Sequence, residues 1–176
     1  MGLVLARPLE REARLRSNTA SFYARGSALA LAIIGTLFVL VHFSPAGNAA
    51  EQAFRRDIIV MGELEEHAQH SAKDAIDKLQ SNQITPAEFS ERIERDVLPQ
   101  WTTIQSTFQK DRVPDDSKLK PLWELLSDYS DTRLAAFKLF DSGARHGRSA
   151  DFKQAQDKLE LGQIDLKLIK DLDHPK

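Results

Sequence analysis

The sequence predicts an all-α protein in which a single N-terminal transmembrane helix is followed by an antiparallel four-helix bundle. Three observations support this prediction. An uncharged apolar run covers residues 28–43, four later segments place apolar residues three and four positions apart, and no segment shows the two-residue alternation of a strand. The predicted parts are residues 1–26, 27–44 and 51–176.

The apolar run is long enough to cross most of a bilayer as a helix. At 1.5 Å per residue, residues 28–43 span about 24 Å, and a helical start near Ala20 closes the gap to a hydrocarbon core of about 30 Å. Phe22 and Tyr23 would then lie in the membrane interface. We therefore expect a signal anchor over residues 27–44.

The charges beside the run predict its orientation. Residues 1–26 hold five arginines and two glutamates, whereas residues 44–50 hold no charge. Because positive flanks stay in the cytoplasm, we expect a single-pass protein of the bacterial inner membrane, with residues 1–26 cytoplasmic and residues 51–176 periplasmic. The alternative is a signal peptide cleaved among the small residues 46–50, which delivers the same domain across the membrane.

The part after the anchor is acidic. All but two of the 26 acidic residues and all but five of the 24 basic residues lie in 51–176, for a net charge of −5. We therefore expect no nucleic-acid partner. The chain has no cysteine, which excludes disulfides, thiolate metal sites and cysteine nucleophiles. With no nucleophile elbow and no phosphate loop, neither a cofactor nor a catalytic residue is expected.

The first two predicted bundle helices lie between residues 51 and 108. In residues 51–80 an apolar seam is interrupted only by Glu65. Its members are Phe54, Ile58, Met61, Ala68, Ala72, Ala75 and Leu79. Residues 85–88 (TPAE) carry the signature of a capping box, so a second helix begins there, and Pro99 is expected to kink it. Its seam is Phe89, Ile93, Val97, Trp101, Ile104 and Phe108.

The third predicted helix follows a turn at residues 113–117. Asp116 or Ser117 is expected to cap its start, and Gly143 and Gly147 are expected to end it. Its inner face is Leu122, Leu126, Tyr129, Ala136, Phe137 and Phe140.

The fourth predicted helix begins at Ser149 or Asp151 and has a heptad-like seam of the kind found in coiled coils. The seam is Phe152, Ala155, Leu159, Gly162, Leu166, Ile169 and Leu172. Because the connections between the four helices are short, we expect neighbouring helices to run antiparallel.

Glu65 and Arg133 are the two charged residues at seam positions, and they form the candidate structural or interaction pair. Three interpretations are open. Both side chains lie at the edge of the core with their heads in solvent, the two pair across the first and third helices, or Arg133 anchors an acidic ligand.

A second candidate group consists of weak metal ligands on the first bundle helix. Glu66, His67 and His70 lie within two turns, beside Glu63, and the spacing of four residues brings carboxylate and imidazole together on one face. A dimetal site in a bundle uses Glu-x-x-His on two helices, and this chain lacks that spacing. A solvated face is therefore expected here, with no metal.

The second half of the chain resembles a known helical module. The matching residues are 94–99 (ERDVLP), Trp101, 113–117 (VPDDS), Pro121, Tyr129, Arg133 and Ala136. They resemble the soluble helical extension found after the membrane core of some proteobacterial rhomboid-type proteins, and the resemblance covers about residues 88–172. A single apolar span cannot supply the protease core, so protease activity is not implied. The resemblance implies an accessory module that contacts other proteins or regulates a membrane partner.

The expected function is accordingly non-enzymatic: a membrane-anchored helical bundle that acts through protein–protein interaction. Its expected partners are the lipid bilayer and either a membrane protein or a second copy of itself. One alternative is a small-molecule sensing bundle that signals through a partner, because residues 1–25 are too few for a kinase or a long signalling coil. The other is a secreted periplasmic helical protein.

Overall fold

The described part of the chain is entirely helical. The computed structural model describes residues 49–110 and 112–173, and of residues 170–173 it describes only the backbone. These ranges contain five helices and no strand. The helices are α2 (Ala49–Gln80), α3 (Pro86–Asp96), α4 (Leu98–Lys110), α5 (Lys120–His146) and α6 (Ser149–Asp173). The prediction of an all-α chain is confirmed for these residues.

The predicted cytoplasmic segment (residues 1–26) and the predicted transmembrane helix (residues 27–44) lie outside the described residues. Within residues 49–110 and 112–173, no helix is both long and apolar enough to cross a membrane.

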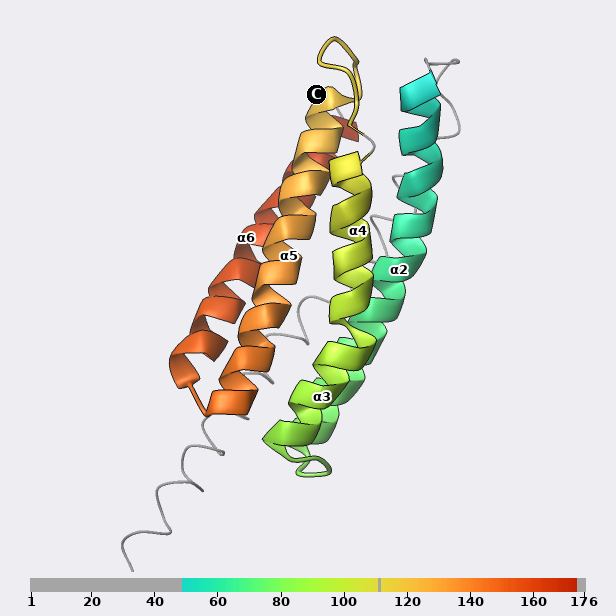
Figure 1. Ribbon diagram of the computed structural model, residues 1–176. Helices are drawn as coiled ribbons and strands as arrows, with labels where there is room; N and C mark the ends of the chain where they lie inside the picture. The colour runs from blue at the N-terminus through green and yellow to red at the C-terminus, as the bar shows by residue number, and fades with distance from the viewer. Residues whose placement is uncertain (1–48, 111, 174–176) are drawn as a thin grey trace, which may run out of the picture.

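The helices form an elongated bundle in which each helix packs against its neighbours in sequence (Figure 1). α2 packs against α3 and α4, these two pack against α5, and α5 packs against α6. No Cα atom of α2 lies within 8 Å of a Cα atom of α5 or α6. Any contact between α2 and α5 therefore has to be made by long side chains.

Contacts between helix ends show that α2 runs antiparallel to α3 and α4, and that α5 runs antiparallel to α6. Phe54 near the start of α2 packs against Phe108 near the end of α4, with ring centroids 6.3 Å apart. Asp74 near the end of α2 instead pairs with Arg92 of α3. On α5, Gly143 near the end lies against Phe152 near the start of α6.

The predicted second helix is interrupted at Val97, where it becomes α3 and α4. Pro99 has no N–H to donate to the carbonyl of Arg95, so the helical ladder cannot continue through it. Val97 has φ −119° and ψ −54°, and α4 starts at Leu98. Pro99 therefore lies in the first turn of a new helix, where no N–H donor is needed. The helix that was expected to kink at Pro99 is thus interrupted at Val97 and continues as α4.

The start of α3 is fixed by the predicted capping box. The Thr85 hydroxyl accepts a hydrogen bond from the Glu88 backbone N–H at 3.2 Å. In return the Thr85 backbone N–H donates to the Glu88 carboxylate at 2.7 Å. The bond from the Thr85 N–H and a second one, donated by the Thr85 hydroxyl at 3.0 Å, lower the pKa of the Glu88 carboxyl group, and Pro86 occupies the first turn as expected.

The predicted ends of the third helix need two corrections. α5 begins at Lys120, and neither Asp116 nor Ser117 caps it, because Pro121 sets the first turn and the cap position falls on Leu119. Ser117 instead accepts the Leu119 backbone N–H at 3.1 Å. Gly143 does not end the helix: it is a buried position inside α5. The end is Gly147 alone, whose φ of 62° closes the helix in the left-handed conformation.

The core contains all the predicted seam residues whose side chains are described, with the charged Glu65 aside. Leu172 lies outside the described side chains. The core also contains apolar residues that the seams did not include, which are Ile76, Ile84, Val113, Leu134 and Ala144. Rings of successive helices pack in a column through its centre, with Trp101 against Phe137 (6.2 Å between centroids) and Phe140 against Phe152 (5.7 Å).

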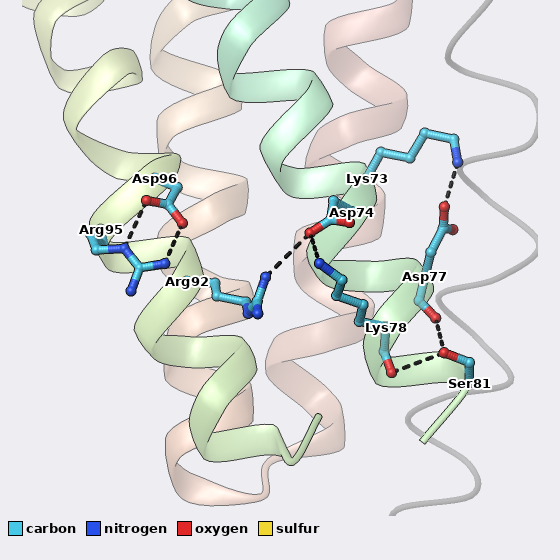
Figure 2. Close-up of polar contacts among 8 residues, drawn as sticks. All are labelled: Lys73, Asp74, Asp77, Lys78, Ser81, Arg92, Arg95 and Asp96. Carbon is cyan, nitrogen blue, oxygen red and sulfur yellow. Dashed lines mark hydrogen bonds and ion pairs between the residues drawn. The ribbon is translucent and has the colours of Figure 1, made fainter. Parts of the chain in front are cut away.

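Polar contacts join α2 to α3 at one end of the bundle (Figure 2). The Asp74 carboxylate accepts from Lys78 of its own helix at 2.7 Å and from Arg92 of α3 at 3.2 Å. Lys73 pairs with Asp77 along α2, and Arg95 pairs with Asp96 on α3. These side chains are partly or largely exposed, so each pair contributes little to stability, and the Asp74–Arg92 contact mainly orients the two helices.

The two buried glycines of the last helix pair should respond oppositely to alanine. A Cβ atom on Gly143 would overlap the Phe152 ring, so Gly143→Ala is expected to lower the free energy of unfolding by about 1–3 kcal/mol. A Cβ atom on Gly162 would lie 3.5 Å from the Tyr129 ring, an ordinary contact. Gly162→Ala should therefore gain up to about 1 kcal/mol from helix propensity. Chemical unfolding followed by circular dichroism measures both, and equal effects would contradict the close α5–α6 approach.

Candidate functional site

A polar cluster lies inside the bundle at the position that the sequence singled out. Glu65 projects from α2, and Arg133 projects from α5. Between them is Tyr129, one turn before Arg133, whose hydroxyl donates a hydrogen bond to the Glu65 carboxylate. The same carboxylate oxygen accepts from the Gln69 side chain at 2.7 Å. The buried phenol of Tyr129 therefore lies between Glu65 and Arg133.

Tyr129 contacts residues of three other helices, α2, α4 and α6. Its ring meets the Trp101 ring of α4 edge to face, with centroids 5.7 Å apart at 76°. The Arg133 guanidinium carbon lies 5.1 Å from the centroid of the Tyr129 ring, a cation–π distance. On α6, Gly162 has no side chain and leaves room for the ring. A side chain as small as alanine at position 162 would still leave the ring its place, at an ordinary contact distance of 3.5 Å.

Burial controls the ionisation of the cluster. The Glu65 residue keeps part of its surface in solvent, but its carboxyl group is enclosed by protein atoms. Desolvation raises the pKa of Glu65, opposed by the hydrogen bond from Tyr129 and the positive charge of Arg133. Burial likewise raises the pKa of Tyr129 well above its usual value. The phenol therefore remains a protonated donor and is unsuited to act as a base.

The geometry separates the three interpretations of the Glu65 and Arg133 pair. Arg133 is only 7% exposed, so the expectation that both charged heads lie in solvent is wrong for Arg133. The two side chains attract each other electrostatically inside the bundle, with Tyr129 bonded to Glu65. The interpretation closest to the observed arrangement is a pair across the first and third predicted helices, bridged by a tyrosine.

The weak metal candidates lie on the outer face of α2. Glu66, His67 and His70 are all exposed, as is Glu63. Among residues 49–110 and 112–173 there is no group of three histidine or acidic residues arranged to hold a metal ion. The structure thus places these side chains in solvent and does not bring them into a common site.

Two features of the site escaped the sequence-based reasoning. Tyr129 was assigned to the core, although a buried tyrosine usually hydrogen-bonds through its hydroxyl, and that rule pointed to a partner for it. The second feature is an exposed apolar strip along α6, which we call the α6 stripe: Leu161, Ile164 and Leu168. Their exposed fractions are 54%, 56% and 46%. The spacing of three and then four residues was visible in the sequence.

The α6 stripe lies opposite the buried seam of the same helix. At 100° per residue its three members fall within an arc of about 60°, on the far side from Leu159 and Leu166. The other exposed large apolar side chains among the described residues are Ile59 and Val60 of α2, which are adjacent in sequence and point apart. The α6 stripe is therefore the continuous apolar strip on the described surface.

Comparison of the chain with family models, curated protein sequences and solved structures gave no significant match. The resemblance to the helical extension of rhomboid-type proteins therefore stays a prediction.

Glu65→Gln should change how stability depends on pH. A raised pKa means that the folded state holds the proton more tightly than the unfolded chain. The wild-type chain therefore loses stability as pH rises from the ordinary glutamate value through the raised pKa, and a neutral Gln does not. The variant should gain stability over the wild type across that range. The exposed neighbour Glu66→Gln is the control, and parallel profiles for Glu65→Gln and wild type would show that the carboxylate is solvated.

Proposed function

We propose that this protein is a non-enzymatic, membrane-anchored helical bundle that acts through protein–protein contacts in the bacterial periplasm. The observation that carries the proposal is the α6 stripe. Large apolar side chains in a continuous strip cost solvation free energy on a monomer, and such strips mark interaction surfaces. A helix that is apolar on two opposite faces fits a role in which one face packs inward and the other binds a partner.

The interior polar cluster supports a structural role better than a catalytic one. The Glu65 carboxylate already receives donors from Tyr129 and Gln69, so its hydrogen bonds serve to join helices. Burial keeps the phenol protonated. A general base or nucleophile needs a perturbed group that faces its substrate, whereas these groups face one another.

The membrane anchor is the second part of the proposal. Its support is the uncharged apolar run at residues 28–43 and the arginine-rich segment before it, which favour a cytoplasmic N-terminus. α2 begins at Ala49, within a few residues of the end of that run. The anchor would hold the bundle at the periplasmic face of the inner membrane, where its partner is a membrane protein or another copy of the chain.

A photo-crosslinking amino acid placed at Ile164 tests the contact role in living cells. The proposal predicts a protein adduct, because Ile164 lies at the centre of the α6 stripe. The same probe at Glu63, an exposed residue on α2, is the control. Adducts that are no more abundant at Ile164 than at Glu63 would remove the support for an interaction surface.

The orientation has its own test. A reporter that is active only outside the cytoplasm, fused after Lys176, should be active in the full chain. Activity of a cytoplasmic reporter at the same position would contradict the assigned topology. Sequencing of the mature N-terminus separates the anchor from the cleaved alternative, since a start between Ala46 and Glu51 would indicate a secreted protein.

A further inference from the structure

We infer that the partner of the α6 stripe is the α6 stripe of a second copy of this chain, with the two helices antiparallel. This inference rests on the proposed function, because it names the partner of the surface assigned there. Its support is the pattern of charges on both flanks of the stripe, which is complementary in the antiparallel arrangement alone.

The stripe has the spacing of a two-helix seam. Leu161, Ile164 and Leu168 alternate steps of three and four residues, as the apolar positions of a coiled coil do. In an antiparallel pair, Leu161 packs beside Ile164 of the second copy, and Ile164 beside Leu161. The two-fold axis then passes between residues 162 and 163. The contact is isologous, so the same surface serves both copies and the assembly closes at two.

On the first flank, the charges complement each other across this axis. Glu160 and Lys167 immediately precede Leu161 and Leu168, and both are exposed. In the antiparallel register, Glu160 faces Lys167 of the second copy, and Lys167 faces Glu160. Neither residue forms an ion pair within the described residues. Both charges are therefore available for a partner.

The second flank repeats the pattern. Lys158 and Asp165 lie on the other side of the stripe, and the same register places Lys158 of one copy beside Asp165 of the other. A cation beside Asp165 would stabilise the charged form of its carboxyl group. Burial of its carboxyl group, together with the negative charge of Asp128 on α5, raises the pKa of Asp165. A lysine from the second copy would offset both effects.

The competing arrangements bring like charges together. In a parallel pair, Glu160 would lie beside Asp165, and Lys153 beside Lys158. Sliding the antiparallel pair by one heptad would place Lys167 against Lys167. Like charges at these flanking positions are destabilising and discriminate between pairings. The charges that flank the α6 stripe thus favour one orientation and one register.

Charge reversal on the full chain, purified in mild detergent, tests the inference by sedimentation. Wild type should dimerise reversibly, and Glu160→Lys should weaken the dimer on the order of tenfold, because two attractive pairs become repulsive. Glu160→Lys combined with Lys167→Glu should restore it. In a parallel dimer, Glu160→Lys would instead strengthen association, and that result would overturn the inference. Glu63→Lys on α2 is the charge-matched control and should have no effect.

Cross-linking in native membranes tests the register. The chain has no cysteine of its own, so single introduced cysteines report cleanly. Differently tagged Leu161→Cys and Ile164→Cys chains, expressed together, should cross-link to each other more efficiently than Leu161→Cys cross-links to itself. A preference for the Leu161→Cys homodimer would overturn the antiparallel register.

The outcomes separate this inference from the proposed function. A monomeric wild type whose Ile164 probe still captures a different protein would refute the second copy as partner and leave the interaction role intact. A probe adduct within the same chain, to residues 1–48, would refute both. Loss of dimer in Ile164→Asp with unchanged helicity, together with rescue in the double charge reversal, would support both.

Discussion

The hydroxyl of Tyr129 is the constraint on which the arrangement of the bundle depends. A phenol that is 3% exposed needs a hydrogen-bond acceptor, because an unsatisfied buried hydroxyl costs about 1–3 kcal/mol. Its acceptor is Glu65 on α2, a helix whose backbone does not approach α5 within 8 Å. The bond therefore links two helices whose Cα atoms stay more than 8 Å apart. Trp101 of α4 and Gly162 of α6 lie against the same ring.

Hydrophobic periodicity predicted the helices and their inner faces because burial follows the 3.6-residue repeat directly. The capping box at Thr85 and the disturbed helix at Pro99 could also be predicted, because in each case the interacting groups lie within four residues of each other. The start of α5 and the role of Gly143 could not be read in this way. Gly143 is selected by the Phe152 ring of another helix, and a glycine looks the same in sequence whether it ends a helix or admits a neighbour.

The candidate site shows the same division between local and tertiary information. Seam positions identified Glu65 and Arg133, since charges on an apolar face stand out in any sequence. The bridging role of Tyr129 depends on which helices lie close together in the fold. The spacing of residues along the chain does not reveal this. The spacing of the α6 stripe was visible in the sequence. A second apolar face on a helix indicates an interaction surface only when the first face is known to be buried.

The proposed anchor and the proposed antiparallel α6 pair together restrict how two bundles could lie against a membrane. An antiparallel α6 pair has its two-fold axis perpendicular to the helices, so two upright bundles would carry their anchors on opposite sides of the dimer. Both anchors enter one bilayer only if the long axes of the bundles lie along the membrane surface. Upright bundles would instead join two facing membranes.

The helices pack only against helices that lie close to them in sequence, and this has a kinetic consequence. Because α2 meets α3 and α4, these meet α5, and α5 meets α6, most native contacts close short stretches of chain. Low contact order of this kind is associated with folding in microseconds to milliseconds. The α5–α6 hairpin, joined by the two residues Gly147 and Arg148, closes the shortest loop between antiparallel helices and so has the smallest loop-closure entropy among them. The Tyr129–Glu65 bond, in contrast, joins residues that are 64 positions apart in the chain.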